Sequence, residues 1–128
     1  MEALEASEPR FVDSLLGAVH RLEGASEARA IREAIRDCAL AIEFRLDTLA
    51  RELEPSRGQL DPSLVPAGRA VEQVLREVLI EAWRLLEAGD DALADHPRLA
   101  SFARAATRAA QREAAFAFAQ LALPEALD

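Results

Sequence analysis

The sequence predicts an all-α protein, an elongated four-helix bundle whose helices run antiparallel and which forms a helical homodimer. Three observations support this class. Apolar residues recur at spacings of three and four over most of the chain, all six prolines fall at the ends of these periodic stretches, and no stretch alternates apolar and polar residues as a strand does. At 128 residues, the chain is expected to be a single domain, 1–128, with one core.

The first two helices are predicted before the proline at position 55. One runs from an N-cap at Ser7 to Gly24, and the second runs from an N-cap at Ser26 to Pro55. At about 1.5 Å per residue the second helix approaches about 40 Å, which favours an elongated bundle. Leu40 and Phe44 widen its apolar face. We therefore expect this helix to be covered on more than one side and to form the centre of the molecule and of the dimer.

The second half of the chain predicts two further helices. The main loop is expected over 55–66, and the third helix follows it to Gly89, with Ile80 and Trp83 beside its apolar stripe. Asp95 is a candidate N-cap for the fourth helix, which is expected to stop at Pro124 and leave a flexible tail, 124–128. Alanines along this last helix predict close packing against a neighbour.

The charge balance excludes several classes of partner. Acidic residues number 23 against 15 basic ones, a formal net charge of −8 that repels phosphate backbones and anionic lipid headgroups. No apolar run reaches the roughly 18 residues that a membrane span requires. The single cysteine, Cys38, sits in an apolar stripe and is expected to be buried, and its isolation fits a reducing cytoplasm. We expect a cytoplasmic protein that binds neither nucleic acid nor membranes.

No constellation of residues indicates catalysis. Carboxylates lie one helical turn apart at Glu43/Asp47 and Glu77/Glu81, but neither histidine has a glutamate three positions before it, as a dimetal bundle requires. Glu43 is instead expected to pair with an arginine across a helix interface. Phosphate loops, nucleophile elbows and zinc spacings are not found in the sequence. The prediction is a protein that is not an enzyme, with no catalytic residue, cofactor or metal.

Three arginines at steps of four residues predict a basic ridge on the last helix. Arg104, Arg108 and Arg112 repel one another by about 0.2–0.5 kcal/mol per pair, so opposite charge should offset them. Either acidic residues of a neighbouring helix or subunit pair with the ridge, or an acidic partner docks on it.

One local segment is similar to the phosphoacceptor segment of histidine phosphotransfer domains. The segment is Ala18-Val19-His20-Arg21-Leu22-Glu23-Gly24-Ala25-Ser26, and that family has Leu, Lys and Gly at the second, third and fourth positions after its histidine. The resemblance implies a phosphorylatable imidazole at His20 and a small residue, Gly24, beside it. Glu23 stands at the lysine position, which places a negative charge where the family has a positive one.

We expect a non-catalytic protein interaction module, an adaptor, regulator or scaffold component that acts through amphipathic helix faces and self-associates. One alternative is a bundle that binds a small apolar ligand among its aromatic residues. The other is a degenerate phosphotransfer protein that uses His20. The candidate interaction residues are Leu40, Phe44, Trp83, Arg104, Arg108 and Arg112, and the candidate ligand-binding residues are Phe44, Trp83, Phe102, Phe116 and Phe118.

Overall fold

The structure, a computed structural model, describes residues 7–54 and 60–127, with side chains placed for 11–54 and 60–121. Within these ranges no strand is present. The predicted all-α class is therefore confirmed. The elements in chain order are α2 (Ser7–Gly24), α3 (Ala28–Glu52), the 3-10 helix η2 (Pro62–Leu64), α4 (Val65–Ala88), the short α5 (Asp90–Leu93) and α6 (His96–Leu127).

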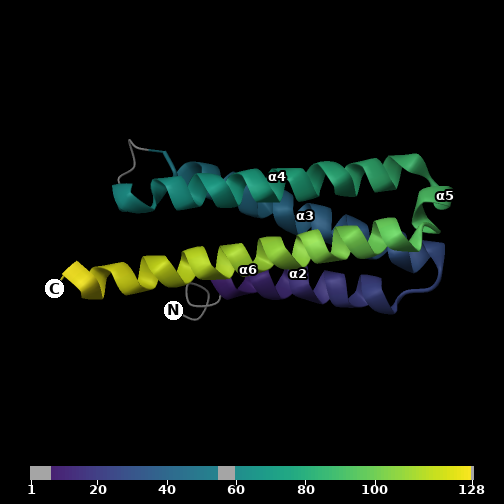
Figure 1. Ribbon diagram of the computed structural model, residues 1–128, viewed down its shortest axis with the longest axis horizontal. Helices are drawn as coiled ribbons and strands as arrows, with labels where there is room; N and C mark the ends of the chain where they lie inside the picture. The colour runs from purple at the N-terminus through teal and green to yellow at the C-terminus, as the bar shows by residue number, and fades with distance from the viewer. Residues whose placement is uncertain (1–6, 55–59, 128) are drawn as a thin grey trace.

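The four long helices lie side by side along the long axis of the molecule (Figure 1). α2 packs against α3 and α6, and α4 packs against the same two helices. Each long helix therefore has two long neighbours. α3 packs against two long helices and also contacts α5, but its outer face is uncovered in the single chain. The expectation that it forms the centre of a dimer stays a prediction.

The core forms where the apolar stripes of the four helices meet. Leu15, Ile35, Leu75 and Phe102 are almost completely buried and come from α2, α3, α4 and α6 respectively. The alanines of α6 behave as predicted over most of its length. Ala103, Ala106, Ala109 and Ala110 are all buried, so the backbone of α6 approaches its neighbours closely there.

The ends of the middle helices differ from the predicted boundaries. Glu27, not Ser26, is the N-cap of α3, and it makes no side-chain capping bond. The predicted loop 55–66 contains the turn η2 and the start of α4, and its first part, 55–59, lies outside the described residues. Asp61 nucleates this turn by accepting a hydrogen bond from the Ser63 backbone N–H at 2.8 Å. Pro66 fits in the first turn of α4 because no intrahelical bond needs its missing N–H there.

The last helix begins as predicted but ends later. Gly89 is the C-cap of α4 and has a φ of 89°, a backbone conformation that favours glycine. The short helix α5 begins at the next residue. Asp95 then accepts a hydrogen bond from the Arg98 backbone N–H at 3.1 Å, which confirms its capping role. The predicted stop at Pro124 was wrong, because α6 runs to Leu127. Pro124 has no backbone N–H, so the helix loses only the hydrogen bond that residue 124 would donate to the Gln120 carbonyl. The flexibility of 124–128 stays a prediction.

Candidate interaction surfaces

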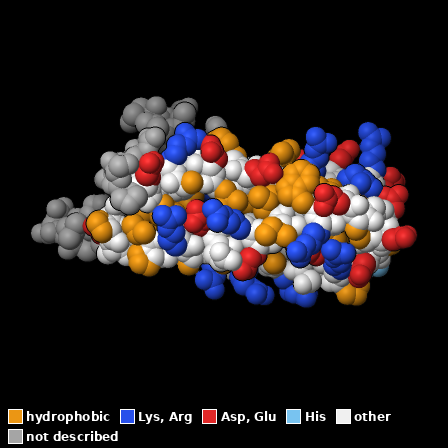
Figure 2. All heavy atoms as spheres, turned by 90° about the horizontal axis from the view of Figure 1, so that it is seen from above, with side chains coloured by type: hydrophobic (Ala, Val, Ile, Leu, Met, Phe, Trp, Pro, Cys, Tyr) orange, Lys and Arg blue, Asp and Glu red, His pale blue; other side chains and the backbone are white. Residues whose placement is uncertain are grey.

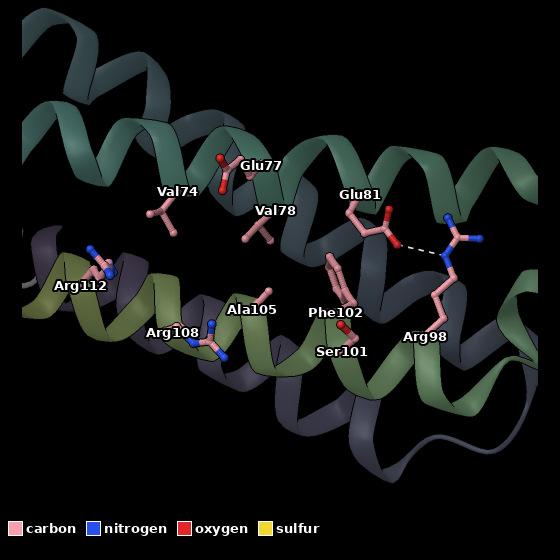
Figure 3. Close-up of a pocket in the computed structure, with 10 residues that line it drawn as sticks. All are labelled: Val74, Glu77, Val78, Glu81, Arg98, Ser101, Phe102, Ala105, Arg108 and Arg112. Carbon is pink, nitrogen blue, oxygen red and sulfur yellow. Dashed lines mark hydrogen bonds and ion pairs between the residues drawn. The ribbon is translucent and has the colours of Figure 1, made fainter.

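A groove lies between α4 and α6, with a volume of about 390 Å³ (Figure 3). In Figure 3, Val74 and Val78 project from α4 toward α6, and Phe102 projects from α6 toward α4. Together with Ala105, these residues give the groove an apolar floor. We call it the α4–α6 groove. Its remaining lining residues are charged or polar: Glu77, Glu81, Arg98, Ser101, Arg108 and Arg112.

The two sides of the α4–α6 groove are not balanced in charge. Glu81 binds Arg98, whose Nε lies 3.0 Å from its carboxylate, and this ion pair links α4 to α6 at one end of the groove (Figure 3). This contact raises the pKa of the Arg98 guanidinium above its usual range, chiefly through the hydrogen bond to Glu81. Glu77 accepts a hydrogen bond from Gln73 Nε2 at 3.1 Å. Arg108 and Arg112 have no ion pair with any described residue.

A second, apolar hollow of about 260 Å³ extends the groove beyond Arg112, which lines both. Phe116 and Val71 contribute its larger side chains, and the rest of its lining is alanine: Ala67, Ala70, Ala115 and Ala119. Small residues on both helices leave the surface shallow along this part of the contact between α4 and α6, which we call the α4–α6 seam. The α4–α6 seam is therefore hollowed over a length that includes Arg98 near the start of α6 and Ala119 near its end.

The predicted basic ridge does not form one surface. Arg108 and Arg112 line the α4–α6 groove, whereas Arg104 lines a different hollow with Leu22 and Glu23 of α2. Because successive steps of four residues turn by about 40° around a helix, the three arginines diverge along α6. In the described part of the chain, none of the three arginines pairs with an acidic residue of a neighbouring helix. Pairing with another subunit and docking of an acidic partner both stay predictions.

Four large hydrophobic side chains are exposed on the neighbouring helices α3 and α4. The indole N–H of Trp83, on α4, donates to the Glu43 carboxylate of α3 at 3.1 Å. Leu40 and Phe44 lie one turn apart on α3, three residues before and one residue after Glu43, and Ile80 precedes Trp83 by one turn of α4. The exposed fractions are 49% for Leu40, 71% for Phe44, 51% for Ile80 and 37% for Trp83. We call these four residues the α3–α4 patch.

The patch corrects one prediction, because Glu43 binds a tryptophan and not the expected arginine. α3 is covered on two sides by α2 and α4, whereas Leu40 and Phe44 are uncovered in the single chain. Their burial in a dimer stays a prediction. Hydrophobic side chains also reach the surface among charged ones on the side of the molecule that carries α4 (Figure 2).

A buried ion pair crosses the interior and escaped the sequence analysis. Arg45 of α3 contacts the Glu113 carboxylate of α6 through Nε, and a second nitrogen, Nη2, donates to it at 3.2 Å. Nη1 reaches Glu52 at 2.8 Å and Thr48 at 3.2 Å. These acidic partners raise the pKa of Arg45 above its ordinary value against the opposing effect of burial. The signal was available, since Arg45 lies three residues after Ile42 and four before Leu49 in the buried stripe.

The remaining candidates are dispersed. His20 is exposed on α2, and Glu23 is exposed one turn after it. Cys38 is buried as predicted, and burial raises the pKa of its thiol to about 12. The five aromatic residues proposed for an apolar ligand do not converge. Phe102 lines the α4–α6 groove and Phe116 its extension, whereas Phe44 and Phe118 are each 71% exposed.

In residues 7–54 and 60–127, neither metal ligation nor a membrane span is indicated. Among the described residues, no group of three or more His, Cys, Asp or Glu side chains is placed to hold a metal ion. In the same part of the chain, every helix is too short or too polar to cross a bilayer. No family model matches the chain, and comparisons with curated proteins and with solved structures give no match. The function therefore has to be inferred from the residues themselves.

Proposed function

We propose that this chain is a non-catalytic interaction module, an antiparallel four-helix bundle that forms a homodimer through the α3–α4 patch. The observation that carries the proposal is the exposure of four large hydrophobic side chains on two helices that pack together, Leu40 and Phe44 on α3 and Ile80 and Trp83 on α4. Apolar residues scattered singly over a surface are ordinary, but several large ones on adjoining helix faces are typical of protein interfaces.

The chemistry of the patch suits burial in an interface. The Trp83 indole N–H already has an acceptor in Glu43, so covering the ring would leave no donor unsatisfied. Tryptophan is also enriched among the residues that dominate binding energy. In a two-fold dimer, each copy presents the same surface to the other. The α3–α4 patch has the two neighbouring helix faces that such a contact would use.

Light scattering coupled to gel filtration tests the dimer, and the chain offers a matched control. Phe44 and Phe118 have the same exposed fraction, 71%, but only Phe44 belongs to the patch. We expect a dimer at micromolar concentration for the wild type and for Phe118→Ser, and a monomer for Phe44→Ser. A wild-type chain that stays monomeric up to about 100 µM would remove self-association from the proposal.

The surroundings of Cys38, the hydrogen bonds of the groove carboxylates and the net charge are consistent with a cytoplasmic, non-catalytic role. Cys38 is inaccessible and its thiol stays protonated near neutral pH, so it is not an available nucleophile. The acidic side chains of the α4–α6 groove accept hydrogen bonds from Arg98 and Gln73 and lie on a shallow surface. The net charge of −8 disfavours nucleic acid and anionic membranes as partners.

A further inference from the structure

We propose that the α4–α6 groove binds an acidic amphipathic helix of a partner protein, with carboxylates of that helix on Arg108 and Arg112. This surface is distinct from the α3–α4 patch, and the inference goes beyond dimerisation. It depends on the charge of the groove, on the spacing of its arginines and on its shape.

The charge of the groove points to an anionic ligand. Most arginines with described side chains bind a carboxylate, such as Arg21 with Asp37, Arg32 with Asp90 and Arg98 with Glu81. Arg108 and Arg112 have no such partner among the described residues and lie beside the same hollow. The groove is lined by three arginines and by two glutamates, of which Glu81 pairs with Arg98 and Glu77 accepts a hydrogen bond from Gln73. In a chain with a net charge of −8, this groove therefore has a local excess of positive charge at Arg108 and Arg112.

The spacing of the two arginines favours a helix over a single carboxylate. Arg108 and Arg112 are four residues apart on α6, and side chains at this spacing lie about 5–6 Å apart at their Cβ atoms. Two glutamates four residues apart on a partner helix have the same spacing. Such a pair can meet both guanidinium groups at once, whereas a fatty acid has one carboxylate.

The shape and lining of the groove favour an elongated, amphipathic ligand. Val74, Val78, Phe102 and Ala105 form an apolar floor, and the alanine-lined hollow beyond Arg112 continues it along the same seam. A helix laid along such a groove places apolar residues on the floor at spacings of three and four. Its acidic residues then lie at the edge, where Arg108 and Arg112 stand.

The test uses the full chain and a labelled helical peptide of about 18 residues, with a leucine stripe edged by glutamates four residues apart. Fluorescence anisotropy measures its affinity at low and high salt. We expect Arg108→Gln and Arg112→Gln each to weaken binding about ten-fold, and the double variant about a hundred-fold. The affinity for the wild type should fall as salt rises, because exposed charges are screened.

Matched controls separate the groove from the overall charge of the protein. The double variant Arg29→Gln/Arg36→Gln removes two exposed charges from α3, outside the groove, and should bind the peptide like the wild type. Phe44→Ser should also leave peptide binding unchanged, so failure of the dimer and failure of the groove are distinguishable. A peptide with glutamine in place of glutamate should bind at least ten-fold more weakly.

Several results would overturn the proposal. The first is equal affinity for the glutamate and glutamine peptides. The second is a loss of peptide affinity in Arg29→Gln/Arg36→Gln as large as in Arg108→Gln/Arg112→Gln. The third is a wild-type chain that binds laurate but does not bind the peptide. A change of oligomeric state in Arg108→Gln/Arg112→Gln would assign the groove to a second copy of the chain instead.

Discussion

Arg45 and Glu113 form a buried ion pair between α3 and α6, two helices that are not packing neighbours. Each of these helices packs against α2 and α4, so the ion pair spans the interior between them. Glu113 is only 1% exposed, and two guanidinium nitrogens of Arg45 contact its carboxylate. The pair therefore links two helices whose main neighbours are α2 and α4.

Removing the cation of this pair should destabilise the protein strongly. Arg45→Met leaves the Glu113 carboxylate buried without its guanidinium, and we expect the free energy of unfolding to fall by about 3–5 kcal/mol. Arg45→Met/Glu113→Leu should recover most of the loss, because the buried Glu113 carboxylate is then also removed and Glu52, the other partner of Arg45, is 28% exposed and can be solvated. Urea denaturation followed by circular dichroism measures both variants.

The exposed pair Arg29–Glu33 supplies the control for this experiment. Its side chains are largely in water, so Glu33→Gln should change the free energy of unfolding by less than about 0.5 kcal/mol. If Arg45→Met costs no more than Glu33→Gln, the buried pair has no structural importance.

Gly68 lies where α4 packs closely against Leu53 and Phe116. A Cβ atom there would lie 2.5 Å from Leu53 Cδ2 and 3.1 Å from Phe116 Cζ. Both neighbours are buried and cannot move freely. Gly68→Ala should therefore lower the free energy of unfolding by about 1 kcal/mol, as crowding outweighs the gain in helix propensity.

Gly17 provides the comparison, because a Cβ at this position in α2 meets only Arg21 Nη1 at an ordinary 3.6 Å. Gly17→Ala should raise the free energy of unfolding by about 0.5–1 kcal/mol. Thermal melts of the two variants should shift in opposite directions. A Gly68→Ala variant that melts as high as Gly17→Ala would show that Leu53 and Phe116 yield without cost.

Cys38 should make the protein less stable at alkaline pH. The pKa of its thiol is raised from 9.0 to about 12, first by desolvation and second by the charge of Asp37. The unfolded chain therefore loses this proton at lower pH than the folded chain. Its contribution to stability is complete below about pH 9 and is lost as pH rises toward 12, by at most about 1.4 kcal/mol per pH unit.

The composition makes this titration easy to isolate. The chain contains no lysine and no tyrosine, so Cys38 is the only side chain with an ordinary pKa in this window. Cys38→Ala should show a flatter dependence of unfolding free energy on pH between 9 and 11. A slope identical to that of the wild type would mean that the thiol is not the group responsible.

Trp83 offers a local probe of the proposed dimer. It is the only tryptophan, and its ring is partly exposed in the α3–α4 patch. Dimerisation through the patch should lower acrylamide quenching of its fluorescence as protein concentration rises from about 1 to about 100 µM. Quenching in Phe44→Ser should not change over this range. A dimer that leaves Trp83 equally quenched at both concentrations would place the interface elsewhere.

The helices themselves were determined by the sequence. Apolar residues at three- and four-residue spacing locate every long helix, because each must bury one stripe whichever neighbour covers it. Local chemistry also predicted the capping role of Asp95 and the end of α2 at Gly24. Boundaries near proline were less accurate. Pro66 and Pro124 lie inside helices, since a missing N–H is tolerated at a helix start and affects one carbonyl near a helix end.

Tertiary structure decided which helix faces meet. The sequence placed the three arginines at steps of four residues, but only the packing of α6 against α4 and α2 decided which hollow each arginine lines. Similarly, the sequence showed charged residues at Arg45 and Glu113 within apolar stripes but did not pair them. Periodicity along one helix specifies a direction around its own axis. The rotation and contact of two helices depend on all four packing together, so grooves, patches and ion pairs between helices emerge only in the folded chain.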